Sequence, residues 1–183
     1  MTLMKVVKIN QIKIKKRTHM NQSTAIEKNP QSEVLIRFSD CDPMGHLNNA
    51  RYLDYFINSR EDHLREFYGI DIYKHSMGSG VGWVVSQNQI AYLKPANLME
   101  TVIVQSQVID HDKSSILVEL FMWNKDKSEM KSVLWSKFVA IEFKSGKRGS
   151  IPEDLLLLLQ DVKTNGVEIS RGFDNRIMQL TKR

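Results

Sequence analysis

One long helical pattern, preceded by a short β-like run and followed by four longer ones, most restricts how this chain of 183 residues can fold. Apolar residues recur at spacings of three, four and seven between residues 50 and 67, which predicts an amphipathic helix of about five turns. Gly69 is expected to stop this helix. The repeating apolar positions are Ala50, Leu53, Phe56, Ile57, Leu64 and Phe67.

The runs beside the helix read as β-strands. The first is expected around residues 34–38, and the others at 82–93, 101–110, 115–124 and 133–144, where Val, Ile, Trp, Phe and Thr are frequent. The polar segments within the last four runs are short, which predicts an antiparallel meander. The stretch MGSGVG, residues 77–82, is expected to be a flexible connector. This order predicts an α+β fold in which a curved, antiparallel, five-stranded sheet wraps around one long helix.

The predicted sheet needs cover on both of its faces. The runs SILVELFMW (115–123) and VLWSKFVAIEF (133–143) are almost continuously apolar, so neither face is expected to lie in water. The long helix would cover one face, and a partner subunit would cover the other. This predicts a homodimer or homotetramer. Pro152 and the acids that follow it predict a short capped helix near the C-terminus.

Positive charge is concentrated at the start of the chain. Residues 1–26 carry +6, whereas the whole chain carries +5, so the remainder is near neutral at −1. We interpret residues 1–30 as a basic tail and linker, and residues 31–183 as one domain with its core at 33–145. Because the tail lacks interleaved aromatic residues for base stacking, we interpret it as solvated and expect no nucleic-acid partner.

The remaining composition excludes several classes of protein. A single cysteine, Cys41, cannot form an internal disulfide, and no apolar run approaches the roughly 20 residues that span a membrane. The N-terminus has no uninterrupted apolar core, so we expect a soluble, cytoplasmic protein without a membrane partner. The histidines are scattered, and Glu61, His63 and Glu66 resemble a solvated helix face. We therefore assign no metal and no cofactor.

The segment FSDCDPMGHLNNARYLDYF, residues 38–56, gathers polar groups where the first strand gives way to the helix. Pro43 favours an extended Asp42, Gly45 permits the chain to reverse, and Asn48 or Asn49 can cap the helix. A carboxylate beside the free N–H groups of a helix start could transfer an acyl group to water. Capping alone would also explain such residues, but one cap suffices, and this turn contains a surplus of polar groups.

The same segment resembles the signature of hotdog-fold acyl-CoA thioesterases of the 4-hydroxybenzoyl-CoA thioesterase type. That motif runs roughly acid-x-Asp-x-x-Gly-His-x-Asn-Asn-x-x-Tyr. The resemblance continues into IAYLKPANLMETVIVQSQV, residues 90–108, and covers about residues 33–145. It implies a hotdog fold and the hydrolysis of an acyl-CoA thioester to free acid and coenzyme A.

The resemblance also implies roles for individual residues. Asp42 would be the catalytic carboxylate, acting either as nucleophile or as general base, and the amide N–H of Asn49 would polarise the thioester carbonyl. His46 would shape the site or hold the turn, and these two roles stay open. Asn48 is expected to be a helix cap, and Asp40 is expected to be structural. Flanked by two acids, Cys41 is not expected to form a thiolate.

Coenzyme A carries phosphates, which need cations at the mouth of the site. We assign Arg51, Tyr52 and Lys94 to substrate binding, with other surface cations as further candidates (Arg60, Lys144, Lys147 and Arg148). The chain departs from many relatives at Ile57 and Asn58, where they carry acids, so Asp42 would act without a second helix carboxylate.

Two alternative functions stay open at this point. The His-x-Asn-Asn element also looks like plant-type acyl-carrier thioesterases, which would make the substrate an acyl group on a carrier protein. A protein that binds acyl-CoA without hydrolysing it, and whose basic tail contacts nucleic acid, is the second alternative.

Overall fold

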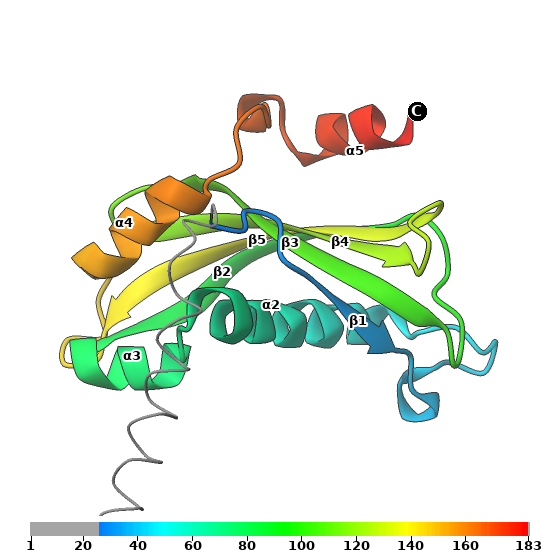
Figure 1. Ribbon diagram of the computed structural model, residues 1–183, viewed down its shortest axis with the longest axis horizontal. Coiled ribbons are helices and arrows are strands. Elements are labelled where there is room, and N and C mark those ends of the chain that lie inside the picture. Colours follow the sequence, from blue (N-terminus) through cyan, green and yellow to red (C-terminus); the bar gives the residue numbers. More distant parts are fainter. Residues whose placement is uncertain (1–25, 183) are drawn as a thin grey trace, which may run out of the picture.

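The computed structural model of the chain describes residues 26–182, in which a curved antiparallel sheet wraps around one long helix (Figure 1). The strands lie in the order β1-β3-β4-β5-β2. Their bounds are Gln31–Leu35 for β1, Val81–Tyr92 for β2, Thr101–His111 for β3, Ser115–Asn124 for β4 and Met130–Glu142 for β5. The α+β arrangement expected from the sequence is confirmed. Up to residue 25, the basic tail proposed for residues 1–30 lies outside the described residues.

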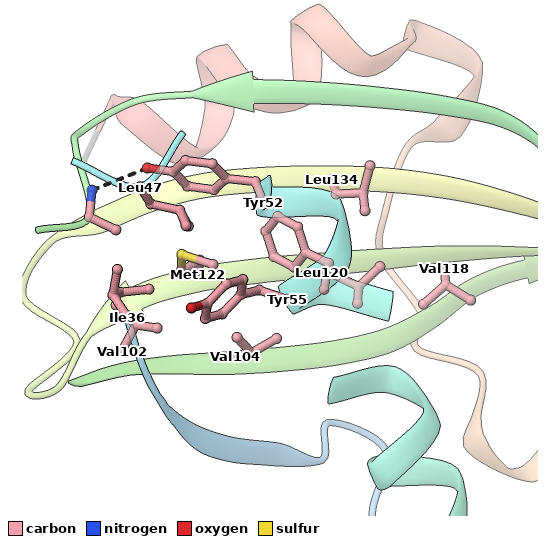
Figure 2. Close-up of a cluster of buried hydrophobic side chains, with 12 residues drawn as sticks. Ile36, Leu47, Tyr52, Tyr55, Val102, Val104, Val118, Leu120, Met122 and Leu134 are labelled. Carbon is pink, nitrogen blue, oxygen red and sulfur yellow. Dashed lines mark hydrogen bonds between the residues drawn. The ribbon is translucent and has the colours of Figure 1, made fainter. Parts of the chain in front are cut away.

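The long helix α2 (Tyr52–Tyr68) follows a 3-10 turn, η2 (Asn49–Arg51), and packs into the hollow of the sheet. It ends at Gly69, which has φ 68°, and the amide of Ile70 donates to the carbonyl of Leu64 at 2.9 Å. The helix end near Gly69 is therefore confirmed. Figure 2 shows the aromatic residues at the start of α2 against the strands. The core residues of this layer are Ile36, Leu47, Tyr52, Tyr55, Phe56, Ala96, Val102, Val104, Val118, Leu120, Met122 and Leu134.

Successive side chains of each strand point to opposite faces of the sheet, one toward α2 and the other away from it. On β4, Val118, Leu120 and Met122 belong to the core against α2, whereas Phe121 belongs to a separate cluster on the outer face. Both faces of this strand are therefore buried, as its continuous apolar run predicts.

The predicted meander is wrong for the second strand. β2 pairs with β5, from Val81 opposite Glu142 to Tyr92 opposite Ser132, and it does not pair with β3. The connection at residues 93–100 is no hairpin, because its backbone groups bond elsewhere. The amide of Leu47 donates to the carbonyl of Ala96 at 2.8 Å. This connection is thereby tied to the turn before α2.

The outer face of the sheet is covered in part by the chain's own C-terminal segment. Helix α5 (Phe173–Thr181) lies on the opposite side of the sheet from α2 (Figure 1). Its apolar residues join the outer cluster, which contains Ile109, Phe121, Val133, Trp135 and Phe173. The expectation that a partner subunit covers this face is thus corrected in part. Helix α4 (Glu153–Val162) closes the other end of the core and confirms a short helix with acids in its first turn, but Pro152 directly precedes it and no side chain caps it.

Three local expectations are also wrong. The first strand ends at Leu35, and Phe38 lies in the 3-10 turn η1 (Phe38–Asp40) with 81% of its surface exposed. The predicted connector at residues 77–82 begins inside a helix, α3 (Ile72–Ser79), and ends in β2. His63 is not on a solvated face, because its side chain is fully buried. Within residues 26–182, no helix is both long enough and apolar enough to cross a membrane.

Candidate active site

The turn between η1 and η2 is closed by backbone pairs. The amide of Asp42 donates to the carbonyl of His46 at 2.8 Å, and the amide of Gly45 donates to the carbonyl of Asp42 at 3.0 Å. Gly45 has φ 77°, in the left-handed region that glycine adopts without strain. The reversal predicted from the glycine is therefore present.

Asp42 has one carboxylate oxygen engaged in this turn. Its Oδ1 accepts the amide N–H groups of Met44 at 2.9 Å and His46 at 3.1 Å. Its Oδ2 has no hydrogen-bond partner among the described residues, and the side chain is half-buried. The first oxygen thus fixes the orientation of the carboxylate, and the second can accept a proton or attack an electrophile.

The helix start follows this turn directly in the chain. The Asn48 side chain accepts the amide of Ala50 at 3.0 Å, so Asn48 is the cap, as expected. The amide of Asn49 has no acceptor within residues 26–182, and its carbonyl accepts the Tyr92 hydroxyl at 2.9 Å. An uncapped N–H at the first helical position can stabilise a developing oxyanion.

Buried tyrosines hold the turn on the fold. The Tyr55 hydroxyl donates to Asp40 Oδ2 at 2.8 Å and accepts the amide of Arg37 at 3.0 Å. Burial, more than the nearby carboxylate of Asp40, raises the pKa of Tyr55. The Asp40 carbonyl accepts the amide of Asn48 at 2.9 Å. These contacts support the structural role expected for Asp40.

Tyr52 is placed in the core, with 2% of its surface exposed, and not in an open substrate groove. Its hydroxyl accepts the amide of Ala96 at 3.1 Å, and its ring packs edge-on against Tyr92 with 5.1 Å between centroids. Figure 2 shows the hydrogen bond to Ala96 as a dashed line. Tyr52 therefore holds the connection between β2 and β3 in place beside the turn.

The other residues assigned from the sequence are more exposed. Arg51 makes an ion pair with Asp54 at 3.0 Å, and Lys94 lies on the surface of the connection at residues 93–100. The His46 ring is half-buried, and the described part of the chain offers it no hydrogen-bond partner. Burial raises the pKa of the Cys41 thiol, and the neighbouring acids raise it further, which disfavours a thiolate as expected.

Sequence reasoning missed a buried polar cluster next to the helix. Arg60, which it counted among the surface cations for CoA phosphates, is only 7% exposed and is not one of them. Arg60 and His63 lie on the same side of α2, and both contact the hydroxyl of Ser106 on β3, at 3.2 Å and 2.8 Å. Their spacing of three residues is the signal that could have indicated a shared face. The apolar pattern alone did not identify this face as buried.

Comparisons with known proteins identify the family of the chain. The family model described as "Thioesterase-like superfamily" matches residues 36–159. The long-chain acyl-CoA thioesterase FadM of Escherichia coli (strain K12) is 27% identical over 126 residues, which cover 68% of this chain and 92% of FadM.

Solved structures show the same fold. The probable thioesterase YbaW from Escherichia coli superposes with a TM-score of 0.63 at 25% identity, covering 73% of this chain and 98% of that one. Slr0204, a 1,4-dihydroxy-2-naphthoyl-CoA thioesterase from Synechocystis, superposes with a TM-score of 0.66 at 12% identity. The latter match covers 73% of this chain and 97% of that one.

Proposed function

Because the chain belongs to the thioesterase-like superfamily, we propose that it hydrolyses an acyl-CoA thioester to a free acid and coenzyme A. The observation that carries the proposal is the Asp42 Oδ2 without a hydrogen-bond partner among the described residues, on a backbone-bonded turn that leads into the uncapped Asn49 amide. The names of FadM and of the naphthoyl-CoA thioesterase agree with a CoA thioester as substrate.

In the proposed reaction, the thioester carbonyl oxygen faces the amide N–H of Asn49. Asp42 Oδ2 removes a proton from a water molecule, whose oxygen bonds to the acyl carbon. The resulting oxyanion accepts the Asn49 N–H, and its collapse breaks the C–S bond. The CoA thiolate leaves and takes up the proton that Asp42 removed. Alternatively, Asp42 attacks the carbonyl itself and expels the CoA thiolate as the C–S bond breaks. Water then hydrolyses the mixed anhydride, which releases the free acid, regenerates the Asp42 carboxylate and supplies the proton that the thiolate takes up.

Asp42→Asn tests the carboxylate without breaking the turn. Asparagine keeps an oxygen that can accept the Met44 and His46 amides, so the fold should persist. Loss of the base should lower kcat by about 10²–10⁴-fold, measured as free thiol released from a panel of short, long and aromatic acyl-CoAs. Asp62→Asn, an exposed change on α2, is the matched control. Wild-type turnover by Asp42→Asn would overturn the assignment.

Asn49→Pro tests the amide donor. Proline lacks the N–H but is well accepted at the first helical position, and Asn48 already has the extended backbone that must precede it. We expect kcat to fall about 10²–10³-fold, the typical loss for one oxyanion donor. Asn49→Ala keeps the N–H and should keep the rate. Equal rates in the two variants would contradict this role.

His46 and the cations enter the proposal as accessory groups. We propose that His46 shapes the acyl site or holds the turn, and that Arg51 and Lys94 face the CoA phosphates. Charge removal at Arg51 or Lys94 should raise KM for acyl-CoA but not for the matching acyl-pantetheine, which lacks those phosphates. The same KM change for both substrates would argue against phosphate contacts.

We also propose that two copies pair through β2, one of the two edge strands of the sheet. Its exposed Val84 and Val85 are suited to burial against a second copy. Sedimentation should then report a dimer, and Val84→Lys with Val85→Lys should give a monomer. A wild-type chain that sediments as a monomer would overturn the pairing.

A further inference from the structure

A largely apolar cavity of about 460 Å³ lies at the end of α2 farthest from the Asp42 turn. Helices α2, α3 and α4 and the strands β2, β4 and β5 enclose it, and Figure 1 shows α3 and α4 together at this end. Its volume falls in the range of small-molecule sites. The apolar wall includes Ile57, Leu64, Val118, Phe138, Leu155 and Leu158.

Arg60 places a positive charge on this wall. Its side chain is 7% exposed, and one guanidinium nitrogen donates to Ser106 Oγ at 3.2 Å. No carboxylate among residues 26–182 lies within ion-pair distance of the guanidinium. Glu61, the neighbouring acid on the helix, pairs with Arg65 at 2.7 Å. Burial of a cation without an acid is costly, and it lowers the pKa of Arg60.

The Tyr68 ring lies 5.9 Å from the guanidinium carbon and makes a cation–π contact with it, but the groups on the other side of Arg60 are neutral and supply no anion. His63 is fully buried between Ser106, at 2.8 Å from Nδ1, and Ser32, at 3.1 Å from Nε2. Burial, and then the charge of Arg60, lowers the pKa of His63 to about 4. Because the Arg60 guanidinium can only donate, the Ser106 hydroxyl oxygen accepts its N–H, and the Ser106 O–H donates to Nδ1 of neutral His63.

A second donor on the cavity wall also lacks an acceptor. Trp83 Nε1 is buried and has no hydrogen-bond partner in the described part of the chain. Protein atoms enclose this N–H, so the polar feature that the cavity offers a ligand is the Arg60 guanidinium, which no carboxylate among residues 26–182 balances.

We propose that this cavity binds an aliphatic chain that ends in a carboxylate, with the carboxylate against the Arg60 guanidinium. The apolar wall takes the chain, and the guanidinium compensates the anionic charge. A planar guanidinium matches a carboxylate with two N–H groups, which an alcohol or an amine cannot reproduce.

The first test compares decanoate, decanol and decylammonium as ligands of the wild-type protein. Tryptophan fluorescence and calorimetry report binding directly, so the result does not depend on thioester hydrolysis. Decanoate should bind at least about tenfold more tightly than decanol, and decylammonium should bind most weakly. Equal affinities for the acid and the alcohol, or no binding of either, would overturn the proposal.

Paired variants locate the site. Arg60→Gln should weaken decanoate about tenfold or more and leave decanol unchanged, whereas Arg65→Gln, on the exposed side of the same helix, should change neither. Leu158→Trp fills the cavity and should weaken both ligands, whereas Leu157→Trp, at an exposed neighbouring position, should not. If Arg60→Gln fails to fold, the Leu158 and Leu157 pair still decides the location. Undiminished binding by Leu158→Trp would exclude this cavity.

Two sources carry this chemistry: a free fatty acid, and the far end of a dicarboxylic acyl group on a thioester. The second arm rests on the proposed function. If the acyl group is the source, Arg60→Gln should raise KM for a dicarboxylic acyl-CoA and not for the plain acyl-CoA of equal length. If the free acid is the source, both KM values should stay unchanged while decanoate affinity falls.

Discussion

Replacing Arg176 with methionine probes the contact that holds the C-terminal segment on the outer face of the sheet. Glu119 of β4 is fully buried there, and its carboxylate accepts four N–H groups. Arg176 provides two of them, from Nε at 2.8 Å and Nη2 at 2.9 Å. Gln107 Nε2 donates at 2.6 Å and Trp135 Nε1 donates at 2.9 Å. The carboxylate is therefore fully satisfied only while α5 is docked.

The expected loss of stability in Arg176→Met comes from leaving the Glu119 carboxylate buried without its cation. Methionine retains most of the apolar stem of Arg176, but Glu119 becomes a buried anion with two neutral donors. Removal of one partner from a buried pair typically costs 3–5 kcal/mol, and the Arg176 side chain is 18% exposed. We therefore expect the low end, a loss of about 3 kcal/mol in the free energy of unfolding.

Urea unfolding at neutral pH measures this loss, and Trp135 fluorescence reports release of α5 because its ring packs against Phe173 at 5.5 Å. Arg171→Met, which removes an exposed pair with Glu168, should cost less than about 1 kcal/mol. The double variant Glu119→Gln with Arg176→Met removes both charges and should recover part of the loss. A loss below about 1 kcal/mol in Arg176→Met, or no recovery in the double variant, would refute the reasoning.

Three further predictions follow from other buried or capped groups. The pKa of His63 is about 4 in the fold and 6.5 when unfolded. His63 is neutral in both states above pH 6.5, and below that pH the unfolded state gains a proton that the folded state does not. Stability should fall by about 3 kcal/mol as the pH drops from 6.5 to 4, and this decline should vanish in urea melts of His63→Gln. The pKa of Asp112 is lowered chiefly by the amide of Ser114, so Asp112→Asn should lower the urea midpoint at pH 7. That deficit should shrink as the pH falls below 3.8, because the unfolded wild type then binds a proton that the folded state takes up only at lower pH. Tyr55→Phe removes the O–H donor to Asp40, so unfolding should be easier by about 1 kcal/mol and thiol release should slow as the turn loosens.

Local pattern accounts for the parts of the fold that depend on nearby residues. The helix from Tyr52 to its end at Gly69 follows from apolar spacing and a left-handed cap, both of which are short-range. The buried strands β3, β4 and β5 follow from their composition. Asn48 as the cap follows from its side-chain chemistry. The candidate catalytic Asp42 was also found from sequence, because a strand, a turn and a helix start are contiguous in the chain.

Only the tertiary structure decided features that join distant segments. β2 pairs with β5 because the residues after β2 bond to the turn before α2, a contact between residues 47 and 96 that no periodicity encodes. α5 reaches the outer face through Arg176 and the buried Glu119, which are far apart in the chain. The sequence predicted Arg60 and His63 to be surface residues, because nothing near them in the chain indicates that they pack against Ser106 of β3. Alternation and caps are set by neighbours in sequence, whereas partner choice and burial depend on which surfaces meet after the chain has folded.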